Sequence, residues 1–395
     1  MSNIKIIILL IICFLLTGCW DRKEISKNTI VTGIAIDTGE KQKYKITIEG
    51  TNAVELNPRT AQGIAPATVL TLEGNSIGEL AHKMNILAAQ RLIYSHMRLL
   101  IISEEVAHKN LLTFLDFFDR DREIRDDFNI IIAKNSKAEK ILKVTNEYKK
   151  LSSLKIFPQL NEMLDEWGGV PGIRLNDFIR TYTSDGQVPM LAAMIVVGNP
   201  EKGNSTTNMK EVIPSAIVKI DSAAFFKKGE LIDFLTLNEV RNLLWIENKI
   251  LHTSLTIPCN EKGKYMDLRI LGSETSVKAK EVKGIPTFHV KIKAEASLEG
   301  TDCKVNLSEV STMNKYNELT NKKMEKDIGK LVEKMQEEYK ADIFGFGEIL
   351  REQDYKHFKK YKNDWSEGFK KSKVYIDVNV KIKRSGIRVN KYDVK

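Results

Sequence analysis

The chain has 395 residues, of which 42% are hydrophobic and 29% are charged, and its formal net charge is +9. This composition is typical of globular proteins and excludes a largely disordered chain, and the length predicts two or three domains. The basic excess is small and interleaved with acidic residues. It fits an ordinary solvated surface, an anionic lipid surface or nucleic acid.

The N-terminal residues predict export. Lys5 gives a positive start, residues 6–16 form an unbroken apolar run, and Leu16-Thr17-Gly18-Cys19 follows. This order is typical of a secretory signal peptide, here residues 1–18. A membrane-spanning helix needs roughly 18 apolar residues, more than this run supplies. We therefore favour a lipobox over a membrane span with an incidental cysteine.

Cleavage before Cys19 would make it the first residue of the mature chain. The prediction is an N-palmitoyl and S-diacylglycerol cysteine, because two or three acyl chains hold a protein on a membrane whereas one anchors it only marginally. Export makes nucleic acid an unsuitable partner. Proximity to anionic lipid would instead give the positive charge a use.

An N-terminal domain is predicted at 19–197. After a polar spacer, alternating apolar side chains indicate a hairpin of strands at 29–36 and 44–50. Capping boxes beginning at Ser76 and Ser136 mark two helix starts. The other predicted elements are a loop at 52–67, a helix at 76–89, a strand at 92–102, a helix from 103 to about 118, a strand at 128–133, a helix at 136–144, helical and loop segments at 148–190, and a strand at 190–197.

A middle domain at 198–254 and a C-terminal domain at 255–395 are predicted to follow. A polar stretch at 198–209 indicates a mobile loop at the junction. The middle domain holds a hairpin-like strand pair at 216–220 and 223–226 and a helix at 237–244. The C-terminal domain holds strands at 255–258, 265–272, 276–282 and 287–298, a tight turn at 283–286, a helix at 308–339, a helix at 348–361 and an alternating strand at 374–383. Helices beside strands predict an α+β or α/β fold.

Two cysteines remain in the predicted mature chain after Cys19. A disulfide-built fold is excluded, since a chain of this length can bury a sufficient core without one. A single bridge between Cys259 and Cys303 is possible outside the cytoplasm, but the sequence does not establish the geometry that it needs.

The chain has no motif that predicts catalysis, a cofactor or a metal site. None of the histidines has a second histidine or cysteine at metal-ligand spacing, and we interpret them as structural: His82, His96, His108, His252, His289 and His357. Neither a Gly-x-Ser-x-Gly elbow nor a phosphate-binding Gly-Lys loop occurs. Alternating acids and arginines at 116–125 indicate surface ion pairs. Gly345-Phe346-Gly347 fits a chain turn, with Phe344 and Phe346 in the core or at an interface. We therefore predict a protein that is not an enzyme.

Two stretches resemble the Ger(x)C family, the C-subunit lipoproteins of spore nutrient germinant receptors. The first is Cys19-Trp20-Asp21-Arg22-Lys23-Glu24-Ile25. The second is Tyr339-Lys340-Ala341-Asp342-Ile343-Phe344-Gly345-Phe346-Gly347, followed by Trp365 and Arg384-Ser385-Gly386. The run from His96 to Ala107 and the Arg120–Arg125 stretch are also similar. The likeness extends along the whole chain.

The resemblance implies a fold of three α+β domains, each a mixed β-sheet with helices packed against it. It implies a receptor complex with two integral membrane subunits, of A and B type, at the outer face of the spore inner membrane. Such receptors respond to amino acids, sugars or nucleosides and start germination. Only Cys19 carries over with a defined role. Trp20 beside it would lie at the lipid interface or pack on the domain.

Two other function classes stay open at this point. A solute-binding lipoprotein would deliver a small nutrient to a membrane partner, and it would have two α/β lobes around a ligand cleft. The strand-rich C-terminal part fits that architecture poorly. A surface hydrolase would need a nucleophile with a base, or a metal site, and the sequence predicts neither.

Overall fold

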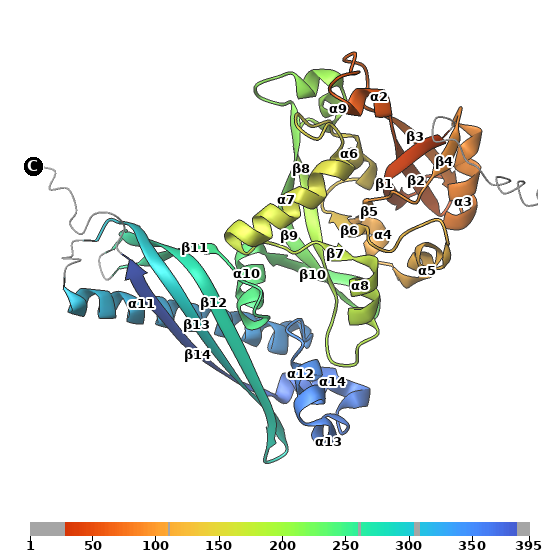
Figure 1. Ribbon diagram of the computed structural model, residues 1–395. Helices are drawn as coiled ribbons and strands as arrows, with labels where there is room; N and C mark the ends of the chain where they lie inside the picture. The colour runs from red at the N-terminus through yellow and green to blue at the C-terminus, as the bar shows by residue number, and fades with distance from the viewer. Residues whose placement is uncertain (1–27, 110, 260–261, 304–308, 385–395) are drawn as a thin grey trace, which may run out of the picture.

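The computed structural model describes residues 28–109, 111–259, 262–303 and 309–384. It has one sheet of ten strands and one of four, with helices packed on both (Figure 1). The α+β class predicted from the sequence is confirmed. The predicted boundary at 197–198 falls inside β8, before its last residue Gly198, and β8 pairs with β9 in the larger sheet. The division into three domains stays a prediction.

The larger sheet has the strand order β10-β9-β8-β6-β5-β1-β2-β3, and β4 and β7 pair with β1 and β6 beside this path. Its strands are β1 (Asn28–Thr38), β2 (Tyr44–Thr51), β3 (Ala67–Gly74), β4 (Arg91–Ile93), β5 (Leu99–Ser103), β6 (Asn129–Ala133), β7 (Ile173–Arg174), β8 (Met190–Gly198), β9 (Ala216–Lys227) and β10 (Glu230–Thr236). The smaller sheet is β11 (Thr253–Pro258), β12 (Tyr265–Val282), β13 (Ile285–Thr301) and β14 (Lys373–Arg384).

The helices of the first half are α2 (Ala53–Leu56), α3 (Ile77–Lys83), α4 (Glu104–Ala107), α5 (Leu112–Arg120), α6 (Ala138–Lys143), α7 (Ser152–Trp167), α8 (Leu175–Tyr182) and α9 (Pro200–Gly203). Those of the second half are α10 (Leu237–Ile246), α11 (Val310–Lys334), α12 (Phe346–Gln353), α13 (Tyr355–Phe358) and α14 (Trp365–Lys371). Short turns of other helix types are η2 (Met84–Ile86), η3 (Thr206–Met209), η4 (Met335–Tyr339) and η5 (Lys362–Asp364).

Helices cover both faces of the larger sheet. The central strands β1, β5, β6 and β8 are parallel, and β5, β6 and β8 are almost wholly apolar, as expected for strands buried on two sides. One face packs on α3, α4, α5 and α8. The other packs on α6, α7 and α10, and this second core continues without a break into the smaller sheet. The two sheets therefore share one hydrophobic core.

Several predicted elements of the first half need correction. The predicted strand at 92–102 is two strands, β4 and β5, because the chain turns where the Met97 amide donates to the Tyr94 carbonyl. The predicted loop at 52–67 contains α2. The capping box at Ser76 is borne out in part, since the Ser76 hydroxyl accepts from the Glu79 amide. The box at Ser136 is wrong, because Lys137 is the N-cap of α6.

The start of α6 is capped from a distant strand. The carboxylate of Asp37, near the end of β1, accepts hydrogen bonds from the Ala138 and Glu139 amides at 2.7 and 3.0 Å. These are two of the amide groups that a helix start leaves without an intrahelical partner. A sequence pattern finds only local caps, and for this reason Ser136 was the wrong choice.

The predicted strand breaks in the second half are wrong for one shared reason. The segments at 216–220 and 223–226 belong to the single strand β9, and those at 265–272 and 276–282 to β12. The pairing register shifts by one residue at Asp221 in β9 and at Leu271 in β12. Such a bulge lets a strand continue where its alternation of apolar and polar residues is interrupted. The hairpin partner of β9 is β10, which was not predicted. The predicted loop at 198–209 contains α9 and η3.

The end of the chain follows the prediction more closely. The long predicted helix is α11 continued by the π-helical turn η4. The helix predicted at 348–361 is divided into α12 and α13 at Asp354, whose φ of −147° is not helical. Strand β14 alternates exposed and buried side chains as predicted, and its buried face includes Val378, Val380 and Ile382.

Candidate interaction site at the junction of the two sheets

A buried aspartate organises the segment that joins η4 to α12. Asp342 is 2% exposed, and its carboxylate accepts hydrogen bonds from the Phe344 amide at 3.0 Å and the Gly347 amide at 2.8 Å. It also accepts from the Trp365 indole nitrogen, at 2.8 Å. Burial raises the pKa of Asp342 to about 6, although these hydrogen bonds act in the opposite direction. The carboxylate thus holds a tight turn closed inside the core.

The turn directs two phenylalanines inward. Gly345 adopts a φ of 74°, a left-handed conformation that glycine reaches at little cost, and the chain then enters α12. Phe344 is 3% exposed and Phe346 is fully buried, stacked on Phe288 of β13 at a centroid distance of 4.6 Å. The interpretation of Gly345-Phe346-Gly347 as a chain turn is confirmed, and both phenylalanines belong to the core.

The same turn contacts the loop at residues 184–189, which we call the junction loop. This loop leads from α8 into β8 of the larger sheet. The Val188 amide donates to the Asp342 carbonyl at 2.8 Å, and the Gln187 side chain donates to the Ile343 carbonyl at 3.1 Å. The Ser184 hydroxyl donates to the Glu348 carboxylate at 2.6 Å. Residues 342–348 thus fasten the larger sheet to the C-terminal part of the chain.

A cavity of about 750 Å³ opens beside this junction. Its lining includes Trp365 and four lysines, Lys227, Lys228, Lys340 and Lys362. Two of these lysines are paired, Lys340 with Glu367 at 3.1 Å and Lys362 with Asp185 at 3.8 Å. Burial and the neighbouring lysines lower the pKa of Lys227. The lining is therefore polar and nearly balanced in charge, and it does not favour one ligand class.

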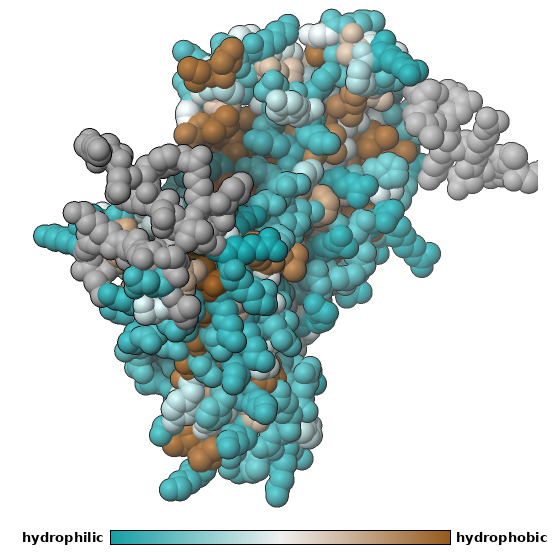
Figure 2. Space-filling model, turned by 60° about the vertical axis from the view of Figure 1, so that its left-hand side comes forward, coloured by the Kyte–Doolittle hydropathy of each residue, from teal (hydrophilic) through white to brown (hydrophobic). Residues whose placement is uncertain are grey.

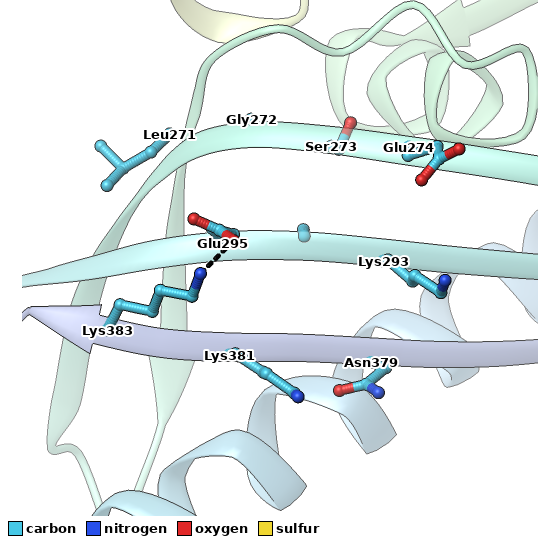
Figure 3. A pocket seen from close by; sticks show the side chains of 10 residues that line it. Leu271, Gly272, Ser273, Glu274, Lys293, Glu295, Asn379, Lys381 and Lys383 are labelled. Carbon is cyan, nitrogen blue, oxygen red and sulfur yellow. Dashed lines mark hydrogen bonds and ion pairs between the residues drawn. The ribbon is translucent and has the colours of Figure 1, made fainter.

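A second hollow, of about 500 Å³, lies on the open face of the smaller sheet (Figure 3). Side chains from β12, β13 and β14 line it, among them Glu274, Lys293 and Lys381. Lys383 of β14 donates a hydrogen bond to Glu295 of the neighbouring strand β13. They stand on a surface that no helix of the described residues covers (Figure 1). An open, charged hollow of this kind lacks the enclosed and mostly apolar lining that is typical of a small-molecule site.

The histidines and the charged stretch at 116–125 do not form a chemical site in the described residues. Within the described residues, no three His, Cys, Asp or Glu side chains are grouped to hold a metal ion. His357 contacts Asp354 at 2.6 Å, and His289 stacks on Tyr375. In the acid and arginine stretch at 116–125, Arg120 pairs with Asp116 at 2.8 Å on the surface, as predicted.

Cys259 and Cys303 are joined by a disulfide bond, with their Cα atoms 6.3 Å apart. The bond connects the end of β11 to the segment that follows β13, and so closes the smaller sheet at one end. Disulfides persist in oxidising compartments. Cys19 and Trp20 lie outside the described residues. Among the described residues, no helix is long and apolar enough to cross a membrane.

Comparison with known proteins identifies the family. Residues 21–196 match the model described as "Spore germination protein N-terminal domain", and residues 221–386 match "Spore germination B3/ GerAC like, C-terminal". The chain belongs to the Ger(x)C family. This is the family of the C subunits of spore germinant receptors, and it is not a known enzyme family.

Relatives of this Ger(x)C protein extend over nearly its whole length. Spore germination protein KC of Bacillus subtilis is 29% identical over 392 residues, covering 97% of this chain and 96% of the relative. Spore germination protein B3 of the same organism is 25% identical over 378 residues, with 93% and 94% covered. The crystal structure of the GerBC protein has a similar fold, with a TM-score of 0.58 at 22% identity, covering 89% of this chain and 97% of that one.

The family stretches of this Ger(x)C protein fall in structurally different places. The stretch around Asp342 builds the junction, whereas the run from His96 to Ala107 forms β5 and α4, with Leu99 to Ile102 fully buried. Asp342 lies within the family motif, but the motif alone gave it no role, and no sequence pattern predicted the junction loop. One signal for Asp342 was present in the sequence: an acid set among apolar residues and glycines, which predicts a buried carboxylate that needs several donors.

Proposed function

We propose that this chain is the lipid-anchored C subunit of a nutrient germinant receptor, needed for spore germination. Membership of the Ger(x)C family over nearly the whole chain carries the proposal, together with Leu16-Thr17-Gly18-Cys19 after an apolar run. Acyl chains on Cys19 hold the protein at the outer face of the spore inner membrane. The disulfide between Cys259 and Cys303 supports an extracytoplasmic location.

The subunit acts through protein–protein contacts and not through catalysis. Its partners are two integral membrane subunits, of A and B type. An anchor confines the protein to the plane of these partners, so that weak interfaces become effective through a high local concentration. The junction around Asp342 supports this role, because its hydrogen bonds hold the two sheets in one arrangement and present their surfaces together.

The lipid anchor is tested by Cys19→Ala. The variant should lose the acylated N-terminus in mass spectrometry, leave the membrane fraction or keep its leader, and germinate weakly. Cys13→Ala is the matched control, because Cys13 lies within the predicted signal peptide and alanine keeps that region apolar. Unchanged fractionation and germination of Cys19→Ala would overturn the anchor.

The partners are tested by co-purification from detergent-solubilised spore membranes. Native protein should carry both integral subunits through the purification, and their absence from a purified, functional preparation would count against the complex. Copies that carry Cys19→Ala should recover less of both subunits, since the confinement to the membrane plane is lost.

A solute-binding lipoprotein is the second candidate, and the cavity beside Trp365 is the observation that favours it. Calorimetry of the protein against amino acids and sugars separates the two functions. Micromolar binding that is lost in Lys340→Ala would favour delivery of a nutrient. Absence of binding in a folded preparation would favour the contact role.

A further inference from the structure

A short apolar segment is held exposed on the larger sheet. It consists of residues 86–89, Ile-Leu-Ala-Ala, in which Ile86 is 68% and Leu87 46% exposed, whereas Ala88 is partly buried against the core. Runs of apolar residues on a protein surface are uncommon unless they serve a contact. We call residues 83–91 the anchor-side segment, because they lie beside the start of the described chain. They include this run and the two basic residues that flank it, Lys83 and Arg91.

The anchor-side segment is fixed by its own contacts. Met84, fully buried, ties η2 to the core. The Asn85 side chain accepts from the Leu92 amide at 3.0 Å and donates to the His82 carbonyl at 3.0 Å. Ile86 and Leu87 therefore project from an ordered turn, and their exposure is part of the fold.

The segment lies beside the point where the described chain begins. Strand β4 pairs in parallel with the start of β1, and Arg91 is opposite Asn28. The Thr29 hydroxyl donates to the Gln90 side chain at 3.1 Å. Asn28 follows Cys19 by nine positions, and nine residues span at most about 30 Å when fully extended. An acylated Cys19 thus keeps this end of the sheet close to the membrane.

Two exposed basic residues flank the apolar run. Lys83 and Arg91 flank it with side chains 53% and 48% exposed. Glu79 lies 3.9 Å from Lys83, and Glu123 pairs with Arg91, so each cation has an acidic neighbour and the net attraction is modest. Binding to a headgroup layer depends on the buried apolar area and on electrostatic attraction, so Ile86 and Leu87 would supply most of it here.

We infer that the anchor-side segment rests on the lipid bilayer, with Ile86 and Leu87 inserted among the headgroups. This inference rests on the proposed lipid anchor at Cys19. It goes beyond a flexible tether, because it fixes which end of the larger sheet faces the membrane. In the view of Figure 2, brown apolar patches are more extensive on the half of the molecule that holds the larger sheet than on the half with the smaller sheet.

Another exposed apolar pair supplies the matched control. Val212 and Ile213 are 100% and 85% exposed and lie shortly before β9, which begins at Ala216. The Asn199 amide donates to the Ser215 carbonyl, which places this pair next to the end of β8. Because β8 runs parallel to β1 through β5 and β6, the pair lies at the opposite end of the sheet from Asn28.

The test uses the lipidated, full-length protein with a single added cysteine, Leu87→Cys or Val212→Cys. Acylation of Cys19 and the bond between Cys259 and Cys303 leave the added thiol free for an environment-sensitive fluorophore. Each protein is reconstituted on vesicles of phosphatidylcholine with phosphatidylglycerol as the minor lipid. Some vesicles carry nitroxide-labelled lipid, which quenches a fluorophore only at close range.

The expected result is a loss of fluorescence at position 87 on nitroxide vesicles and unchanged fluorescence at position 212. Equal quenching at the two positions, on protein that floats with the vesicles, would overturn the inference and leave the anchor intact. Failure of the protein to float would overturn the anchor, and the inference with it.

Discussion

Gly186 and Gly347 meet backbone to backbone where the junction loop contacts α12. A Cβ atom on Gly347 would lie 2.5 Å from the Cα of Gly186 and 2.6 Å from the Trp365 indole nitrogen. Backbone and a buried indole ring cannot move away as a flexible side chain can. The close fit of the junction therefore depends on the absence of a side chain at both positions.

Gly347→Ala is expected to destabilise the protein by about 1–3 kcal/mol, the usual cost of an overpacked core. Residue 347 is inside α12, where alanine is the more favourable residue by up to about 1 kcal/mol, so helix propensity would predict the opposite sign. Denaturant unfolding followed by circular dichroism measures the difference. An unchanged or raised midpoint would show that the junction is looser than these contacts require.

Gly329→Ala is the matched control. Gly329 lies inside α11, and a Cβ atom there would meet nothing within 4 Å. Helix propensity then acts alone, and the substitution should stabilise the protein by about 0.5–1 kcal/mol. Opposite signs for the two glycines would separate the packing effect from the helix effect.

Asp342 should make stability fall as the pH rises between about 4 and 6. Burial raises its pKa to about 6 from an ordinary 3.8, so the folded state binds the proton more tightly than the unfolded state. The stabilising effect of that proton is complete when the pH is below the pKa of Asp342 in the unfolded state. It is lost as the pH rises through the pKa in the folded state. The difference corresponds to about 3 kcal/mol at 1.36 kcal/mol for each pH unit.

Asp342→Asn should remove this part of the pH dependence, since an amide does not titrate. The free energy of unfolding, measured at several pH values for both proteins, gives a difference curve that changes between pH 4 and 6 and is flat above. Other titrating groups cancel in the difference if they lie far from position 342. A flat difference curve over the whole range would contradict the raised pKa.

The sequence predicts those parts of this fold that local patterns determine. The alternation in β14 and the three-to-four spacing of apolar residues in α11 were read correctly, because each element has one buried face. The strands β9 and β12 were divided in error, because a bulge resembles a strand end when the partner strand is unknown. The cap of α6 was missed because Asp37 lies about a hundred positions away.

The junction shows why the site was harder to predict than the fold. The turn around Asp342 was recognised from Gly345 and Gly347, whose spacing is visible in the chain. Its partner, the loop at 184–189, carries no pattern of its own, and only the packing of α12 against it gives Gly186 a role. Long-range contacts of backbone with backbone leave little trace in a single sequence.

The free edge of β14 supplies a third prediction. The amides of Val378, Val380 and Ile382 donate to side chains on α11, namely Glu325 at 3.2 Å, Asn321 at 2.8 Å and Asn317 at 3.0 Å. The spacings match, because four helical residues rise about 6 Å and two strand residues about 6.6 Å. The helix thereby closes an edge that could otherwise pair with another chain.

Asn321→Ala is expected to cost about 1 kcal/mol, because the Val380 amide loses its acceptor. It should also raise the tendency to self-associate, measured by sedimentation at increasing concentration. Lys322→Ala, the neighbouring exposed position on α11, should change stability by less than about 0.5 kcal/mol. Equal effects of the two substitutions would mean that the edge is not protected by these side chains.

Glu49 supplies the fourth prediction, on the sheet face that packs against α7. Its carboxylate is 2% exposed and accepts from the hydroxyls of Thr32, at 3.1 Å, and Ser153. Burial raises the pKa of Glu49 to about 7 from 4.5, although both hydroxyls act in the opposite direction. The folded state therefore holds this proton up to neutral pH, and stability should fall between about pH 4.5 and 7.

Glu49→Gln should gain stability relative to the native protein as the pH is raised from 5 to 8, because the native carboxylate must ionise in a buried site and the amide does not. Glu73→Gln is a control of opposite sign. Glu73 accepts hydrogen bonds from the Glu40 and Lys41 amides, and these lower its pKa. Its stabilising effect is therefore present when the pH is above the pKa of the unfolded state, and it is lost in acid. The unfolding midpoint of Glu49→Gln, taken at pH 5 and pH 8, should rise relative to the native protein as the pH is raised. That of Glu73→Gln, taken at pH 3 and pH 5, should fall relative to the native protein as the pH is raised, because only the native carboxylate gains its stabilising charge over this range. Parallel shifts would show that the sites of Glu49 and Glu73 do not differ in the way that their contacts imply.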